Sequence, residues 1–187
     1  ISGSYQRVEI ANGKAVLRSE AFVYPDIGTA SPRTISTSLA AADGNDIWSI
    51  SFGRTNHFHV VRNPAAKRRT ETTTRPDGTQ LIQVYTNGLL QSTEARDADG
   101  VTLTQRLRTY DAFNRLAVLD EAAPDGTRRL IRYSYDAAGQ ITNTTVSAGQ
   151  LSQSTSISFD NMGRPLQIVY PDGGVVQRAY NARGQII

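Results

Sequence analysis

The chain has 187 residues, of which 39% are hydrophobic and 20% are charged, and its formal net charge is +3. The hydrophobic share lies below the about 45–50% that is usual in globular domains, so it favours a thin sheet with one modest apolar face over a compact globule. The chain has no cysteine, which excludes disulfides and thiolate metal sites, and its short apolar runs provide neither a signal peptide nor a membrane span.

Residues 1–75 are predicted to be a divergent β-rich part built from degenerate repeats. Tyr5–Ile10 and Lys14–Arg18 flank an Asn-Gly pair, the favoured two-residue turn of a β-hairpin. Residues 24–75 are less regular, and their pattern predicts no single arrangement. Its clearest signals are a helical turn at Ser36–Ala42 and strands at Ile47–Phe52 and His57–Val61.

His57 and His59 are the two histidines of the chain, and this spacing on a strand places both rings on one face. A metal site would need a carboxylate such as Asp46 or Glu71 to converge on them through folding. Because no spacing in the sequence requires that convergence, we expect two strand residues on a partly exposed face, with no metal and no other cofactor. His57 and His59 remain the candidates for a metal site.

A basic run lies at Lys67, Arg68 and Arg69, with Arg62 and Arg75 nearby. Such a patch can bind nucleic acid or acidic glycans, but a charge run of this size is more often a solvated loop. No nucleic-acid recognition motif accompanies it. We therefore expect a solvated loop and no specific nucleic-acid partner.

Residues 76–187 form the second expected part, in which a short motif repeats. After a hairpin at residues 81–93, a turn at residues 97–100 and a strand at residues 101–108, an aromatic residue followed by Asp or Asn recurs in steps of 25, 24 and 21 residues. The motif residues are Tyr110 and Asp111, then Tyr135, Asp136 and Gly139, then Phe159, Asp160 and Gly163, and finally Tyr180, Asn181 and Gly184.

Each residue type of the motif has a role in a β-turn. The aromatic residue ends a strand by packing on the sheet, and the Asp or Asn side chain bonds backbone amides two residues further on. Glycine, or Asn114 in the first copy, accepts the positive φ that the last turn position requires. These regular positions favour turn capping over acid–base or calcium chemistry. Asn181 supports this interpretation, because it replaces Asp in the last copy and caps a turn without a charge.

Pro-Asp-Gly turns at residues 76–78, 124–126 and 171–173 mark a superperiod of 48 and then 47 residues. Between turns, apolar and polar residues alternate with a period of two, as in Ile131, Tyr133 and Tyr135. The predicted fold is all-β, an antiparallel β-meander of repeated hairpins in an open sheet, such as a segment of a shell or solenoid. Its later strands are expected at Arg115–Asp120, Thr127–Tyr135, Gln140–Val146, Gln150–Phe159, Arg164–Tyr170 and Val175–Tyr180.

The repeat resembles the tyrosine-aspartate (YD) repeat of the rearrangement-hotspot (RHS) family, which includes the related shell of teneurins. The resemblance is carried by residues 110–116, 135–141, 159–166 and 180–186 with the Pro-Asp-Gly turns between them, and it covers residues 76–187. In that family, arrays of hairpins wind into a hollow β-shell, which encloses a toxin segment in bacterial members and serves adhesion in others. Carbohydrate binding has been associated with these repeats.

The resemblance implies a non-enzymatic structural segment of a larger bacterial protein, secreted or at the cell surface. The chain begins with Ile1 instead of Met, and no plug motif or toxin sequence follows the repeats, so we expect a piece of a longer protein. The expected partners are other segments of the same protein or other copies of this chain. Glycans and an enclosed toxin polypeptide are further partners that the family implies.

Three alternatives remain open. The first is a carbohydrate-binding or adhesion module, with Tyr133, Tyr135, Phe159, Tyr170 and Tyr180 as a stacking platform, although aromatic residues at strand ends more often pack on the sheet. The second is a self-assembling extracellular filament subunit, because exposed edge strands invite pairing with another copy. The third is an enzyme centred on the histidines, which we do not expect because no nucleophile elbow, phosphate-binding loop or dinucleotide fingerprint is present.

Overall fold

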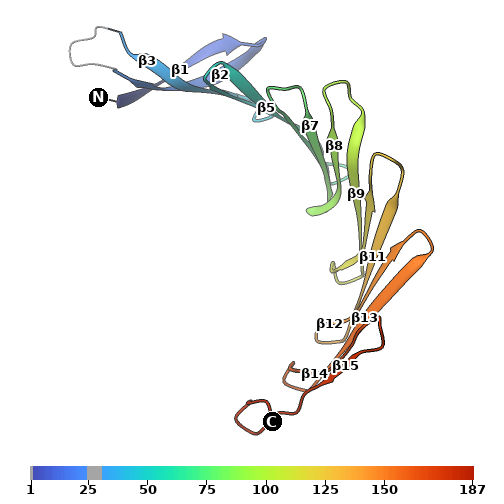
Figure 1. Cartoon of the computed structure of the whole chain (residues 1–187). Coiled ribbons are helices and arrows are strands. Elements are labelled where there is room, and N and C mark those ends of the chain that lie inside the picture. The colour runs from blue at the N-terminus through green and yellow to red at the C-terminus, as the bar shows by residue number, and fades with distance from the viewer. Residues whose placement is uncertain (1, 25–30) are drawn as a thin grey trace. The chain divides into compact units, whose positions relative to one another are not determined.

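The computed structural model describes residues 2–24 and 31–187, and every regular element within them is a β-strand. The chain divides into two compact units, residues 1–103 and residues 104–187. Within each unit, successive strands run antiparallel and lie side by side in a single layer (Figure 1). The all-β antiparallel meander predicted from the sequence is therefore confirmed.

The first unit orders its strands in the sheet as they occur in the sequence. They are β1 (Ser2–Ala11), β2 (Lys14–Val23), β3 (Arg33–Ala41), β4 (Asp46–Ser51), β5 (Arg54–Asn63), β6 (Arg68–Thr74), β7 (Gln80–Thr86) and β8 (Leu89–Arg96). As predicted, an Asn-Gly turn joins β1 to β2, with φ of 51° at Asn12 and 71° at Gly13. These two left-handed residues give the turn the twist that an antiparallel pair requires.

The apolar core of the first unit lies on one face of its sheet. Val16, Leu39 and Ala41 are buried there, and Trp48 and Ile50 pack against them. The strand register sets Val16 opposite Ala41 and Leu39 opposite Trp48, so these side chains point to the same side. We call this side the core face.

The helical turn predicted at Ser36–Ala42 is wrong, because Ser36 lies within β3, which continues to Ala41. Thr37, Leu39 and Ala41 are buried and alternate with more exposed residues, which is the period of a strand. Packing of these side chains between β2 and β4 outweighs the turn-forming tendency of the neighbouring serines. Residues 25–30 of the segment for which no arrangement was predicted lie outside the described residues.

The solvated loop predicted for the basic run is correct only in part: Lys67 ends the turn before β6, whereas Arg68 and Arg69 begin that strand with exposed side chains. The Arg69 guanidinium lies 4.4 Å from the centroid of the Tyr85 ring, and its Nε lies 2.9 Å from Glu71 Oε1. Arg69 thus has an ion-pair partner on its own strand, Glu71, and an aromatic ring from its cross-strand neighbour Tyr85 on β7. The β-branched threonines that follow Arg69 favour the strand as well.

The second unit begins within β9 and keeps the sequence order of its strands. They are β9 (Thr102–Tyr110), β10 (Leu116–Ala122), β11 (Arg128–Tyr135), β12 (Ile141–Ala148), β13 (Leu151–Phe159), β14 (Pro165–Val169) and β15 (Val175–Gln177). The last strand is shorter than predicted. Tyr180 lies beyond its end and forms an isolated bridge with Ile186.

The two faces of the second unit differ in chemistry. Leu119, Ile131 and Val146 align across β10, β11 and β12, and Ile131 is buried. The opposite face carries hydroxyl and amide groups, and there Asn143 Nδ2 donates to Ser154 Oγ at 2.9 Å. The alternation that predicted these strands therefore places Leu119, Ile131 and Val146 on one face and Asn143 and Ser154 on the other.

Candidate functional site

The motif turns of the second unit share one geometry. In the first copy, Asp111 Oδ1 accepts hydrogen bonds from the backbone amides of Phe113 and Arg115, both at 2.9 Å. The Asp111 amide donates to the Arg115 carbonyl oxygen at 2.9 Å and closes the loop. Asn114 holds the last loop position with φ of 62°. The carboxylate thus satisfies amides that a short loop leaves without partners.

The other copies use the same caps. They join Asp136 to the Gln140 amide, Asp160 to the amides of Met162 and Arg164, and Asn181 to the amides of Arg183 and Gln185, at 2.9 to 3.0 Å. The pKa of Asp160 lies below its ordinary value, chiefly because the Arg164 amide donates to the carboxylate; desolvation opposes this effect, and the Arg164 guanidinium adds to it. Asn181 makes both bonds without a charge.

Arg115 connects its own turn with the next copy of the motif. Its Nε donates to Asp111 Oδ2 at 2.7 Å, and its guanidinium carbon lies 4.4 Å from the centroid of the Tyr135 ring. Its Nη1 donates to the backbone carbonyl oxygen of Asp136 at 3.2 Å. A second hydrogen bond joins the same two copies, because the Tyr135 hydroxyl donates to the Leu116 carbonyl oxygen at 2.8 Å.

The third and fourth copies are joined in the same way. Arg164 Nε donates to Asp160 Oδ2 at 2.6 Å, and its guanidinium lies 4.4 Å from the centroid of the Tyr180 ring. The Tyr180 hydroxyl donates to the Pro165 carbonyl oxygen at 2.9 Å. We call this arrangement of arginine, aromatic ring and tyrosine hydroxyl the inter-repeat contact.

The second and third copies use a neutral version of the inter-repeat contact. Gln140 Nε2 donates to the Gly163 carbonyl oxygen at 2.9 Å, where the third copy has Phe159 instead of tyrosine. A Cβ on Gly163 would lie 2.9 Å from Gln140 Nε2, and Gly163 has φ of 79°, so glycine provides both the turn conformation and the space for the amide. Arginine thus precedes each copy that has a tyrosine in the inter-repeat contact, and glutamine precedes the copy that has Phe159.

The sequence predicts the caps but not the inter-repeat contact. Arg115, Gln140, Arg164 and Gln185 each stand five residues after the aromatic residue of their copy, which is the signal in the sequence. That regularity marks the position without showing that the side chain reaches the next copy. The residue that each side chain contacts in the next copy can be identified only once the register of the strands is known.

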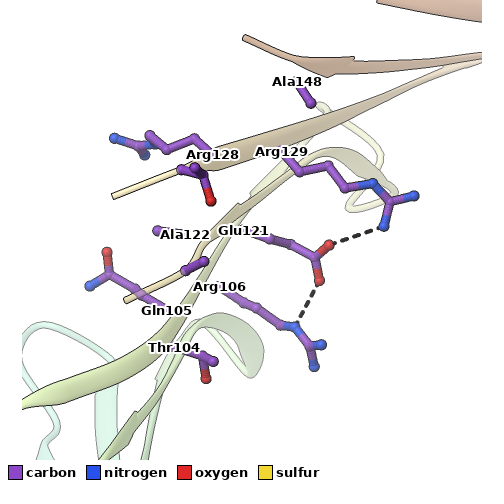
Figure 2. Close-up of a pocket in the computed structure, with 10 residues that line it drawn as sticks. Thr104, Gln105, Arg106, Glu121, Ala122, Arg128, Arg129 and Ala148 are labelled. Atoms are coloured by element: carbon purple, nitrogen blue, oxygen red, sulfur yellow. Dashed lines mark hydrogen bonds and ion pairs between the residues drawn. The ribbon is translucent and has the colours of Figure 1, made fainter. Parts of the chain in front are cut away.

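Two of the aromatic residues considered as a stacking platform for glycans, Tyr135 and Tyr180, each have an arginine against the ring. Tyr170 is 43% exposed. An open pocket of about 320 Å³ elsewhere on the second unit contains Glu121 between Arg106 and Arg129 (Figure 2). The two Glu121 oxygens lie 2.8 Å from Arg106 Nε and 3.4 Å from Arg129 Nη1, so the pocket holds a cross-strand ion-pair row and no aromatic residue.

The first unit brings both histidines to one carboxylate on its core face. Asp46, the first residue of β4, stands opposite His59, and Trp48 stands opposite His57 on β5. Asp46 Oδ1 lies 2.7 Å from His57 Nε2 and 2.8 Å from His59 Nδ1. The other carboxylate oxygen of Asp46 accepts a hydrogen bond from Lys14.

Asp46 is almost fully buried, at 4% exposure, and it stays ionised. Burial by itself raises its pKa, but the hydrogen bonds from Lys14, His57 and His59 outweigh burial and hold the pKa of Asp46 well below its ordinary value. Glu71, the other carboxylate considered from the sequence, does not join them. It stands opposite Val60 in the sheet register and therefore points to the opposite face.

Comparison with known proteins identifies no family. No protein-family model matches the chain, and no curated protein matches it. Among solved structures, the chain is similar to a porin-like protein from Bacteroides uniformis, with 11% sequence identity and a TM-score of 0.42, over 99% of this chain and 86% of that chain. A similarity at this level assigns no function. Within the described residues, no helix is long and apolar enough to cross a membrane.

Proposed function

We propose that the chain is a non-enzymatic structural segment, a wall of repeated hairpins within a larger bacterial protein of the RHS and YD-repeat type. The observation that carries this proposal is the inter-repeat contact. Arg115 and Arg164 each hold the carboxylate of their own turn and the aromatic ring of the next copy. The most regular residues of the sequence are thereby used for joining repeats.

Such contacts suit a wall because a single-layer sheet buries little apolar surface. The buried hydrophobic residues among those described are Val16, Leu39, Ala41, Val60 and Ile131. A cation–π contact contributes about 0.5–1 kcal/mol at an exposed site, and a hydrogen bond contributes about 1 kcal/mol. Repeated at the turns at one end of the strands, these contributions stabilise the single layer of strands that each unit forms.

The proposal includes an extracellular or cell-surface location, with other segments of the same protein as the main partners. Its direct test is the mass of the native product. An antibody raised against residues 104–187 should detect, in the organism of origin, a polypeptide much larger than the 20.4 kDa of this chain. A single native product of 20.4 kDa would contradict the proposal that the chain is a segment of a larger protein.

A self-assembling subunit is the second candidate, and β1 favours it. This ten-residue strand is the first in the sheet order and pairs only with β2 among the described strands. Val8 and Ile10 on it are 77% and 75% exposed. Long, apolar edge strands are templates for pairing with another chain. Sedimentation equilibrium should show a mass that rises with concentration, whereas a monomer at high concentration would rule this candidate out.

A further inference from the structure

Three possible metal ligands converge on the core face of the first unit. One ligand atom each from Asp46, His57 and His59 lies within 4.8 Å of the other two. Two of these residues are separated by one position on β5, and the third is the direct cross-strand partner of His59. The antiparallel register therefore sets the three side chains together, and no flexible loop has to close over them.

Neighbouring side chains fix the orientation of these groups. The Trp48 ring stacks on His57 with the centroids 4.9 Å apart and the planes at 3°, which holds the His57 ring with Nε2 toward Asp46. Lys14 binds the second oxygen of Asp46 and leaves Oδ1 to face both imidazoles. Neighbouring groups that fix the orientation of the ligands distinguish a metal site from a chance cluster of side chains.

We propose that Asp46, His57 and His59 bind a divalent transition-metal ion, with Zn²⁺ as the representative ion. Two imidazole nitrogens and one carboxylate oxygen match the donor preference of Zn²⁺, and water completes the tetrahedron. The histidine side chains are 33% and 40% exposed, so solvent reaches the site. When the ion binds His57 Nε2 and His59 Nδ1, each neutral ring carries its single proton on its other nitrogen, so metal bonds replace the hydrogen bonds to Asp46 Oδ1.

Lys14 gives the proposal a distinguishing consequence. Its ammonium group lies beside Asp46, and Asp43 Oδ2 binds the same ammonium at 2.9 Å. A positive charge at this position opposes a bound cation. Removing it should therefore strengthen metal binding, although the same change removes a hydrogen bond from a buried carboxylate and lowers the stability of the unit without metal.

The test is a Zn²⁺ titration of the whole chain, in competition with a chromophoric zinc indicator. Trp48 is the only tryptophan, so its emission reports on the stacked His57 ring at the same time. We expect one ion per chain and a change in Trp48 emission that saturates at the same ratio. His57→Gln and His59→Gln should each weaken binding at least about tenfold. Lys14→Gln should strengthen it severalfold.

Glu71→Gln is the matched control, because this carboxylate lies on the opposite face and pairs with Arg69. It should leave the affinity unchanged. The proposal is overturned if Zn²⁺ does not bind at one per chain, or if binding survives unchanged in both histidine variants. Far-ultraviolet circular dichroism verifies that each variant is folded. Should a histidine variant fail to fold, the Lys14→Gln result decides alone, and weaker or unchanged binding there contradicts the site.

Discussion

Buried charge in this sheet is always matched by a partner among the described residues. Glu20, at 7% exposure, accepts hydrogen bonds from the Tyr5 hydroxyl and the Arg18 guanidinium. Within the described chain, no buried side-chain nitrogen or oxygen lacks a partner. The core face of the first unit therefore combines apolar contacts with two polar clusters, one around Glu20 and one around Asp46.

Glu20 gives a prediction about pH. Its pKa lies below the ordinary value, chiefly because the Tyr5 hydroxyl donates to it; desolvation opposes this effect, and Arg18 adds to it. A carboxylate with a lowered folded-state pKa stabilises the fold above its unfolded pKa of about 4.3, and this stability is lost as the pH falls through the folded-state value. Tyr5→Phe should therefore reduce the free energy of unfolding at pH 7 more than at pH 3. Equal losses at both values would show that the hydroxyl does not set the pKa.

At the residue scale, what the sequence could predict depends on distance along the chain. Asp111 caps amides two and four residues away, so local rules of turn chemistry were enough. Arg115 meets Asp136, which is 21 residues away, and no local rule identifies that partner. Asp46 joins the histidines over 11 and 13 residues through the β4–β5 register, which the sequence left undetermined.

At the element scale, turn chemistry explains most hairpins, and the β4–β5 turn departs from it. Asn-Gly pairs at residues 12–13 and 87–88 occupy the left-handed positions of their two-residue turns. Between β4 and β5, the first of these positions holds Phe52, with φ of 50° and 82% exposure. A bulky residue in the left-handed region is strained, and burial of the ring does not offset the strain here.

Replacing Phe52 should therefore stabilise the first unit. Phe52→Asn gives this turn the Asn-Gly pair of the other two hairpins, and we expect the free energy of unfolding to rise by about 1 kcal/mol. Asn87→Phe is the reciprocal control and should lower it by a similar amount. Urea unfolding of both variants measures the changes. A loss of stability in Phe52→Asn would mean that the exposed ring makes a stabilising contact.

Two elements were mispredicted because local composition and strand pairing disagree. Serines in β3 are typical of turns, and adjacent arginines in β6 are typical of solvated loops, yet both segments occupy the middle of the first unit's sheet. Each lies between two strands whose backbone groups need partners. In the second unit, the regular turns delimited every strand, so the predicted and observed bounds differ by a few residues.

At the scale of the whole molecule, repetition made the fold class predictable. A period of two between turns of fixed chemistry permits little besides an antiparallel meander, and the structure contains one. The function of such a sheet is less accessible from the sequence, because no residue that performs chemistry recurs. What recurs instead are the residues that join one repeat to the next.

The edge strand β1 provides a prediction at this scale. Val8→Lys combined with Ile10→Lys should abolish concentration-dependent association, because charged side chains on an edge strand oppose pairing with a second sheet. Val61→Lys is the matched control, since Val61 is 55% exposed but lies on β5, which has a neighbour on each side. Sedimentation velocity distinguishes the variants. Association that persists in the β1 variant would exclude this edge as the interface.

The measurement that tests the central claim most directly is a double-mutant cycle on Arg115 and Tyr135. Arg115→Met keeps the apolar stem and removes the guanidinium, and Tyr135→Leu keeps apolar bulk and removes the ring and hydroxyl. Urea unfolding of both single variants and the double variant should give a coupling energy of about 1 kcal/mol. Arg115→Met with Tyr180→Leu is the control pair and should be additive within about 0.5 kcal/mol. Equal additivity in both pairs would contradict a wall in which the motif joins neighbouring repeats.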